Sequence, residues 1–381
     1  MGYSLKYFAK DYLERIYVLL LPYEETRNII LRTHYFRGND SLRKLRFSVV
    51  IGNVRTELVG RDRELSILYS RLRSINPSPI ILHGPVGSGK TALLRALTYL
   101  ANRFGGAFTV LINASRPYTK ESIKFLGTLG IHYQASEILR SLVKEVDGVG
   151  IKGVVRRVTS AISLITSGSG FRSKVLLVID DLNRVMSREE IMDYCKSLYE
   201  WIKWDLSNSV SSALVIITTP HYVLSHEYLF RREVIPAQIW NLGRSEFMKL
   251  LNKVINHSGI DYEVIWYLTG GNPGALEWLM NLNWDLKKWL KFLTYGLINV
   301  AEGALGLSRL RKLAEDPDSD EEGAEVLERL GLMIRVREEF MMGNYVRDLE
   351  LGTGKYWAWQ IPAYPHLILK SDLVRKYLLE H

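Results

Sequence analysis

The chain has 381 residues, of which 47% are hydrophobic and 24% charged, so it has the composition of a folded globular protein with two or three domains. Its single cysteine, Cys195, excludes an intramolecular disulfide and a multi-cysteine zinc site. No apolar stretch approaches the roughly 20 residues that cross a bilayer. The N-terminal segment carries Lys6, Lys10 and Asp11 where a signal peptide needs its apolar core. We therefore expect a cytoplasmic protein.

Positive charge is unevenly distributed along the sequence. The net charge is +9, but residues 302–381 hold 11 Lys and Arg against 15 Asp and Glu, which leaves 39 against 26 for residues 1–301. A surface that attracts phosphate groups therefore belongs to the first three quarters of the chain. If DNA is bound, residues 1–57 and the basic segment 152–174 are the candidates, although a solvated helix face is the favoured interpretation of the second segment.

The first part of the chain predicts an α/β domain. Residues 1–57 have apolar side chains at helical spacing up to Pro22 and predict a basic helical leader. In residues 58–242, short apolar segments alternate with helical patterns, which predicts a parallel sheet covered by helices on both faces. The predicted strands lie at 79–83, 108–112, 174–179, 213–219 and 234–242.

Strand patterns disappear after residue 242. Residues 243–301 predict a helical lid domain, with Gly270, Gly271 and Pro273 separating two of its helices. Residues 302–381 begin helical, pass through an acidic run and end with short alternating segments near 333–337 and 356–361. This last part predicts a small winged-helix-like domain.

The strongest motif is a glycine-rich segment between the first predicted strand and a helix. Its pattern is Gly-x4-Gly-Lys-Thr, in which backbone N–H groups surround phosphate oxygens and the lysine reaches the β- and γ-phosphates. The threonine hydroxyl in this pattern is a ligand of Mg²⁺. The segment consists of Gly84, Pro85, Val86, Gly87, Ser88, Gly89, Lys90 and Thr91.

A second motif places two carboxylates at the end of a buried strand. Residues 174–179 are almost entirely apolar and are followed by Asp180 and Asp181, about 90 residues after the glycine-rich segment. Asp180 is the candidate ligand for Mg²⁺ and Asp181 the candidate for orienting an attacking water. A turn aspartate at a strand end is the simpler alternative for either residue.

Other residues indicate which base the nucleotide carries and which side chains could contact its γ-phosphate. An Asn-Lys-x-Asp sequence would read guanine, but Asn252 and Lys253 lack the following carboxylate, so adenine is the expected base. Thr218 and Thr219 end the predicted strand 213–219, and both are candidate sensors of the γ-phosphate. A purely structural threonine pair is an equally good interpretation.

Together these motifs resemble the archaeal ATPase family of the STAND branch, related to AAA+ ATPases. The resemblance extends over about residues 57–365 and includes the Gly-Arg-x-x-Glu-Leu segment after Val59 and the Gly-Gly-Asn-Pro turn. It implies a P-loop α/β domain, a helical lid and a C-terminal winged helix. It also implies that Val59, Gly60 and Arg61 lie near the adenine and that Pro273 approaches the nucleotide.

The resemblance also suggests where catalysis departs from the AAA+ pattern. Arg231 and Arg232 occupy the place where AAA+ relatives carry an arginine finger, although solvated charges at a helix end are the alternative. Asp181 stands where AAA+ enzymes usually have a glutamate, so hydrolysis is expected to be slow. The lid turn contains no arginine, as expected for the STAND branch.

These features predict a Mg²⁺-dependent ATPase that binds ATP and ADP and works as a conformational switch. Lys90 and Asp181 would be catalytic, and the output would reach a protein partner or a second copy of the chain. One alternative is a DNA-binding replication or mobile-element ATPase resembling archaeal origin-recognition proteins. Another is a scaffold that binds ATP or ADP with little turnover.

Overall fold

The structure is a computed structural model of the chain. It describes residues 47–75, 77–114, 123–126, 150–167, 174–182, 186–219, 233–255 and 259–378. The contacts within it divide the chain into two units. Unit 1 contains residues 63–83 and 90–237, and unit 2 contains residues 42–62, 84–89 and 238–381, as far as these are described.

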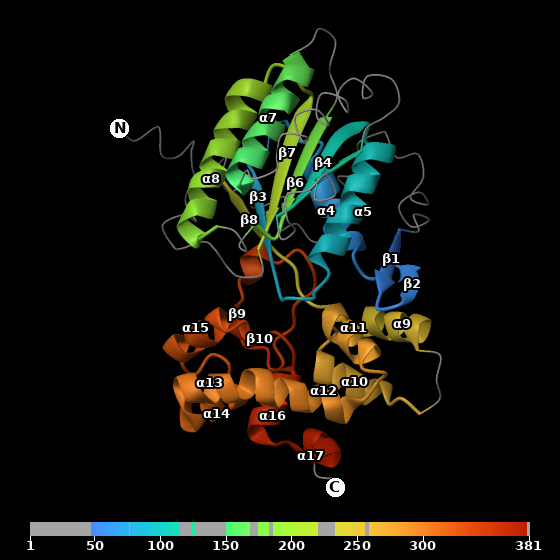
Figure 1. The fold of residues 1–381 in the computed structure, drawn as a ribbon, viewed down its shortest axis with the longest axis vertical. Coiled ribbons are helices and arrows are strands. Elements are labelled where there is room, and N and C mark those ends of the chain that lie inside the picture. The colour runs from blue at the N-terminus through green and yellow to red at the C-terminus, as the bar shows by residue number, and fades with distance from the viewer. Residues whose placement is uncertain are drawn as a thin grey trace. The chain divides into compact units, whose positions relative to one another are not determined.

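Unit 1 is built on a six-stranded sheet with the order β5-β4-β6-β7-β3-β8 (Figure 1). Strands β4, β6, β7 and β3 are mutually parallel, and β5 pairs with β4 in the antiparallel direction. Nearly every described side chain of the central strands is buried, as a parallel sheet covered on both faces requires. The strands are β3 (Ile80–His83), β4 (Ala107–Asn113), β5 (Ile123–Leu126), β6 (Lys174–Asp180), β7 (Ser212–Thr218) and β8 (Ile235–Gln238).

Helices cover both faces of this sheet, with α7 and α8 on one side and α5 on the other (Figure 1). The order of strands, with β3 between β7 and β8, confirms the predicted α/β fold class. No helix among the described residues is both long and apolar enough to cross a bilayer. The helices are α4 (Asp62–Arg71), α5 (Lys90–Arg103), α7 (Ile151–Ser167), α8 (Arg188–Glu200) and the π-helix Trp201–Leu206.

The predicted helical leader is wrong for its last residues. Most of residues 1–57 lie outside the described part of the chain, but β1 (Ser48–Ile51) and β2 (Val54–Glu57) form an antiparallel hairpin. Burial alternates along β1, and in β2 the exposed Arg55 is followed by the buried Thr56. This strand pattern covers only four residues in each strand, which is too short to stand out in the sequence. In unit 2 the hairpin is held by Glu57, which pairs with Lys253 at 2.9 Å, and by the N–H of Gly52, which donates to Glu277.

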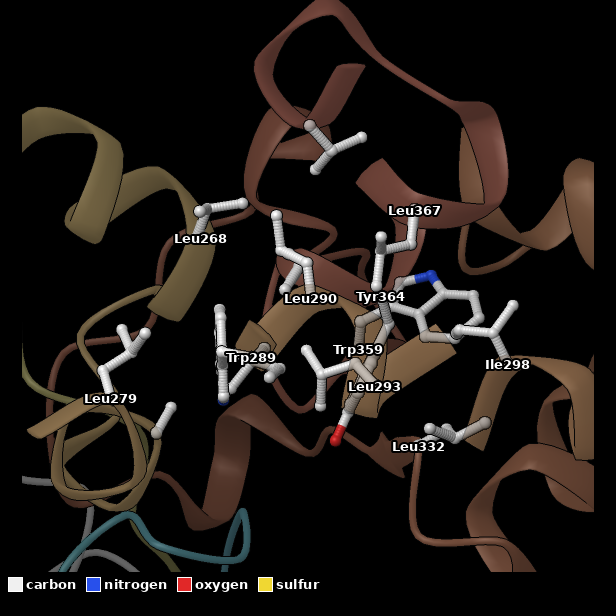
Figure 2. Packing of buried hydrophobic residues seen from close by; sticks show 14 of the residues in the cluster. Leu268, Leu279, Trp289, Leu290, Leu293, Ile298, Leu332, Trp359, Tyr364 and Leu367 are labelled. Carbon is white, nitrogen blue, oxygen red and sulfur yellow. The ribbon is translucent and has the colours of Figure 1, made fainter. Parts of the chain in front are cut away.

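Unit 2 is mainly helical and has one extended hydrophobic core. Figure 2 shows side chains of this core, in which Trp289 and Trp359 are almost completely buried among leucines. Each helix contributes one apolar face, the arrangement expected of amphipathic helices. The helices are α9 (Arg244–Val254), α10 (Tyr262–Thr269), α11 (Pro273–Asn281), α12 (Leu286–Leu293), the π-helix Thr294–Ile298, α13 (Asn299–Leu305), α14 (Leu307–Glu315), α15 (Glu321–Arg329), α16 (Ala363–Leu369) and α17 (Asp372–Leu378).

The C-terminal part of unit 2 adds a small antiparallel ribbon, β9 (Met333–Arg335) with β10 (Trp357–Trp359). Short 3₁₀ segments, Glu338–Phe340 and Leu349–Leu351, lie in the connection between the two strands. The core that contains Trp289 of α12 also contains Trp359 of β10, so the segments predicted as lid and as C-terminal domain share one hydrophobic cluster. The name winged helix for residues 302–381 stays a prediction.

Acidic side chains hold the C-terminal part of unit 2 together. Asp320 caps the N-terminus of α15 by accepting from the N–H of Gly323, and it accepts two hydrogen bonds from the guanidinium of Arg309. The hydrogen bond from Arg309, followed by that from Gly323, lowers the pKa of Asp320 to about 2. Arg335 pairs in turn with Glu321 and Glu325. The negative charge of this region is therefore used within its fold.

We predict that Asp320 makes unit 2 less stable in acid. Its pKa is lower in the folded chain than in the unfolded chain, so its contribution is complete above about pH 4 and is lost as the pH falls towards 2. Replacing Asp320 by Ala should cost about 1–2 kcal/mol at neutral pH, because the cap and the ion pair both disappear. Urea unfolding at several pH values measures both effects, and Asp372→Ala, at an exposed aspartate of α17, is the control.

Candidate functional site

The glycine-rich segment forms a loop between β3 and α5. Gly87 and Gly89 adopt positive φ angles of 77° and 94°, a backbone region that side chains with a Cβ rarely enter. Within the loop, the N–H of Ser88 donates to the carbonyl of Pro85 at 3.1 Å. A Cβ on Gly87 would also lie 2.6 Å from Oδ1 of Asn272. The loop therefore needs glycine at Gly87 for two independent reasons, one conformational and one steric.

Residues from the lid (243–301) and from the C-terminal segment (302–381) hold this loop within unit 2. Nδ2 of Asn272 donates to the carbonyl of Val86 at 2.8 Å, and the N–H of Gly274 donates to the carbonyl of Gly87 at 2.9 Å. The N–H of Val86 donates to Oε1 of Gln360 at 2.8 Å. The conformation of the loop is thus fixed by residues that follow it in the sequence by more than 180 positions.

Arg61 is a third support of the loop. Its guanidinium is buried, and Nη2 donates to the carbonyl oxygens of Ser88 at 2.6 Å and of Trp240 at 2.7 Å. The family resemblance predicts that Arg61 lies near the adenine. In the structure its side chain donates hydrogen bonds that hold the loop. Its neighbours have structural surroundings of the same kind: Val59 packs against the core of unit 2, and a Cβ on Gly60 would lie 2.6 Å from the side chain of Glu246.

Helix α5 begins where the loop ends. Lys90 and Thr91 are its first residues, and its first turn carries no acidic side chain. The first N–H groups of a helix have no acceptor within it, and the helix dipole places partial positive charge there. Together with the ammonium of Lys90, this makes the start of α5 suited to an anion such as a phosphate.

Asp180 lies at the end of β6 and is nearly fully buried. One carboxylate oxygen accepts from the hydroxyl of Thr91 at 2.8 Å, and the other accepts from the hydroxyl of Thr218 at 2.6 Å. Strands β6 and β7 are parallel neighbours, which places their C-terminal residues at the same edge of the sheet. The two residues predicted as metal ligands, Thr91 and Asp180, are therefore adjacent.

Asp181 has an unusual backbone. Its φ angle is 60°, in the left-handed region, which costs a residue other than glycine about 1 kcal/mol and which Asp tolerates better than most. Its N–H donates to the hydroxyl of Thr218 at 2.8 Å. Thr218 therefore contacts both aspartates, one through each of its hydrogen-bonding functions. Strained backbone of this kind is often found at functional sites.

The contacts of the remaining predicted residues do not indicate a role for them. Thr219 is buried, and its N–H donates to the carbonyl of Leu82 in the neighbouring strand β3. Pro273 is the first residue of α11, directly after the N-cap Asn272. Arg231 and Arg232 lie outside the described residues.

The two segments considered for DNA binding are only partly described. Residues 1–46 and 168–173 lie outside the described part of the chain. In α7, Lys152 forms an ion pair with Glu190 of α8 at 2.6 Å, and Arg156 is exposed. Part of the positive charge of the basic segment 152–174 is thus neutralised within unit 1.

Several residues of the site were not singled out as site residues by sequence analysis. Asn272 lies in the Gly-Gly-Asn-Pro turn, where Asn before Pro is the pattern of a helix N-cap, but nothing in the sequence indicates that its amide reaches the loop. Thr218 belongs to the threonine pair that ends a predicted strand, but nothing in the sequence indicates that it contacts both aspartates. Asn241 and Gln360 lie in no motif. Contacts over such sequence distances depend on the tertiary fold.

We predict that Gly87→Ala destabilises the chain more than Gly331→Ala. The φ angles of these glycines are 77° and 75°, but a Cβ on Gly331 meets nothing within 4 Å, whereas one on Gly87 meets Asn272 and Gly274. The backbone strain is common to both variants and costs about 1 kcal/mol, so any larger loss in Gly87→Ala reports the steric conflict. Urea unfolding of both variants measures the difference. Equal losses would contradict the close packing of loop and lid.

Comparison with known proteins gives a family for the chain. A family profile described as an ATPase domain predominantly from Archaea matches residues 58–279. No curated protein sequence matches the chain. The profile covers the loop, both aspartates and the turn at Asn272, so the residues described above lie within the matched region.

Solved structures that match are distant. One is a chain of the E. coli MS115-1 HORMA:CdnC:Trip13 complex, with 17% identity, 58% of this chain and 74% of that chain covered, and a TM-score of 0.33. Another is a chain of Drosophila ORC bound to DNA, with 13% identity, 89% and 94% covered, and a TM-score of 0.38. The family assignment rests on the profile. Because the profile matches more than half of the chain and includes the loop and its carboxylate partners, the protein belongs to the family of ATPases found predominantly in Archaea.

Proposed function

We propose that this protein binds and hydrolyses ATP with Mg²⁺ and works as a nucleotide-driven conformational switch. The observation that carries the proposal is the 2.8 Å hydrogen bond between the hydroxyl of Thr91 and Asp180. It joins the residue that ends the glycine-rich motif to the carboxylate that ends a buried strand 89 positions later. A hydroxyl and a carboxylate side by side, next to a phosphate-binding loop, are the protein contribution to a Mg²⁺–nucleotide site.

Phosphate binding is attributed to the loop and the start of α5. Positive φ angles at Gly87 and Gly89 allow the backbone N–H groups to turn towards an anion, as in phosphate-binding loops. Lys90 follows directly and adds a full positive charge. Supports from Arg61, Asn272 and Gln360 fix the loop before any ligand arrives, which reduces the entropy lost on binding.

The donor set suits Mg²⁺. Magnesium prefers oxygen ligands and is usually bound by one or two protein groups together with substrate phosphates and water. Thr91 and Asp180 would hold it, and the ion would supply charge neutralisation to the phosphates. Thr218 fixes the second oxygen of Asp180, which leaves the oxygen facing Thr91 oriented for this role.

Asp181 is the proposed general base or water-orienting group. Its neighbour Asp180 is engaged by two hydroxyl groups, so the two carboxylates have different surroundings and can have different functions. The hydrogen bond from the N–H of Asp181 to Thr218 fixes the backbone from which the carboxylate extends. An aspartate is shorter than a glutamate, and we expect turnover to be slow.

The phosphate-binding segment is where a nucleotide would act as a switch. Residues 84–91 are continuous in the sequence, and Lys90 within them would contact the γ-phosphate. Hydrolysis removes one phosphate and changes that interaction, and a conformational equilibrium biased by it would be the output.

Replacing Lys90 by Ala should weaken ATP binding by at least tenfold, because the variant removes the positively charged side chain that directly follows the proposed phosphate-binding loop. Isothermal titration calorimetry with Mg²⁺ and ATP measures the affinity. Lys196→Ala, at an exposed lysine of α8, is the matched control and should bind as the wild type does. Unchanged affinity in Lys90→Ala would contradict the assignment of the loop.

Asp181→Asn should preserve ATP affinity and reduce turnover by two orders of magnitude or more, as expected when a general base is removed. Steady-state release of phosphate measures turnover, and Asp193→Asn on α8 controls for loss of one negative charge in unit 1. Turnover that is equal in the wild type and in Asp181→Asn would favour the scaffold that binds nucleotide without using it.

Binding of DNA remains a prediction from the sequence. The same turnover assay with and without duplex DNA tests it, because a DNA-loading ATPase should be stimulated and the stimulation should weaken with salt. Turnover that is independent of DNA favours a protein-directed switch.

A further inference from the structure

The contact between Gln360 and the phosphate-binding loop has features that fold stability does not explain. Gln360 directly follows β10, and its side chain is 3% exposed. It reaches Val86, which lies 274 positions earlier, through a single hydrogen bond. The side chain therefore connects the C-terminal part of unit 2 with the centre of the loop.

The direction of this hydrogen bond fixes the orientation of the amide. A backbone N–H can only donate, so the oxygen of Gln360 must face Val86 and the NH₂ group must face away. The nitrogen Nε2 is buried and has no hydrogen-bond partner in the described part of the chain. A buried donor without a partner costs free energy. Methionine would fill a similar volume and remove this cost, but it would also remove the acceptor of the Val86 N–H, so the two changes offset each other in stability.

The contact is part of a closed ring of hydrogen bonds around Val86. The main-chain carbonyl of Gln360 accepts from Nδ2 of Asn241, and Oδ1 of Asn241 accepts from Nδ2 of Asn272. Asn272 donates to the carbonyl of Val86, which returns the ring to its starting residue. Both polar atoms of the Val86 backbone are therefore held, one by the lid and one by the C-terminal segment.

We propose that Gln360 is a positioning residue of the phosphate-binding loop, through which the C-terminal segment sets the affinity for nucleotide phosphates. This inference rests on the proposed function. The hydrogen bond to Val86 keeps the loop in the conformation that presents its N–H groups, so its loss increases the disorder that phosphate binding must remove. A change in the C-terminal segment that displaced Gln360 would lower nucleotide affinity without altering any residue of the motif.

Gln238 provides a matched control within the same unit. Its amide is also buried and also holds the C-terminal part, because Nε2 donates to the carbonyl of Arg335 and Oε1 accepts from the N–H of Arg337. Both the oxygen and the nitrogen of the Gln238 amide therefore form hydrogen bonds, whereas only the oxygen of the Gln360 amide does so in the described part of the chain. Gln360→Met and Gln238→Met are therefore the same chemical change at two buried amides with different partners.

The experiment measures ATP and ADP affinity by calorimetry and thermal unfolding without nucleotide, for the wild type and both variants. Gln360→Met should bind ATP and ADP about fivefold more weakly, the value of one hydrogen bond of about 1 kcal/mol, with little change in the unfolding temperature. Gln238→Met should unfold at a lower temperature and bind both nucleotides with wild-type affinity.

Four outcomes overturn the inference. Unchanged affinity in Gln360→Met would remove the positioning role, and tighter binding would show that Gln360 competes with phosphate for Val86. An equal loss of affinity in both variants would reduce the contact to a general structural one. A wild-type chain that does not bind ATP overturns the proposed function itself and this inference with it, whereas wild-type binding with an unaffected variant overturns the inference alone.

Discussion

The hydrogen bonds that hold the backbone of Val86 are the constraint on which the conformation of the glycine-rich loop depends. A glycine-rich loop has more conformational freedom than other segments and loses more entropy when it is ordered. Here the lid supplies Asn272, the C-terminal segment supplies Gln360, and Arg61 holds the loop two residues further along, at Ser88. The loop is therefore ordered during folding, and under the proposed function its donors would be oriented before a phosphate group binds.

The second constraint is the double hydroxyl environment of Asp180. A buried carboxylate needs hydrogen bonds that replace its hydration, and Thr91 and Thr218 provide them from two different elements of unit 1. Thr218 also accepts from the N–H of Asp181, which has a strained backbone. One threonine thus determines the geometry of both aspartates, although by sequence it is an ordinary residue at the end of a buried strand.

The acidic character of residues 302–381 has a structural explanation. Asp320 is neutralised by Arg309, and the carboxylate of Asp318 accepts from the backbone N–H groups of Tyr356 and Trp357. These contacts attach the helices of the C-terminal part to the ribbon strand β10. Some of the acidic side chains therefore serve the fold, and the net negative charge makes this part of the chain a poor partner for phosphate groups.

The sequence by itself determined the α/β class, the position of the glycine-rich loop between β3 and α5, and the two aspartates at the end of β6. These features depend on local patterns: apolar runs of strand length, a glycine spacing that only a tight turn requires, and charge at the end of a buried strand. Four of the five predicted strands agree with β3, β4, β6 and β7 within two residues at either end, because buried parallel strands carry a strong apolar signal.

Only the tertiary structure decided which side chains support those motifs. The hairpin at residues 48–57 was missed because its alternation covers only four residues in each strand. The roles of Arg61, Asn241, Asn272 and Gln360 depend on contacts between segments that are distant in sequence, and no local pattern encodes such contacts. The physical reason is that a hydrogen bond depends on the position and direction of both partners, and the packing of the whole unit sets these.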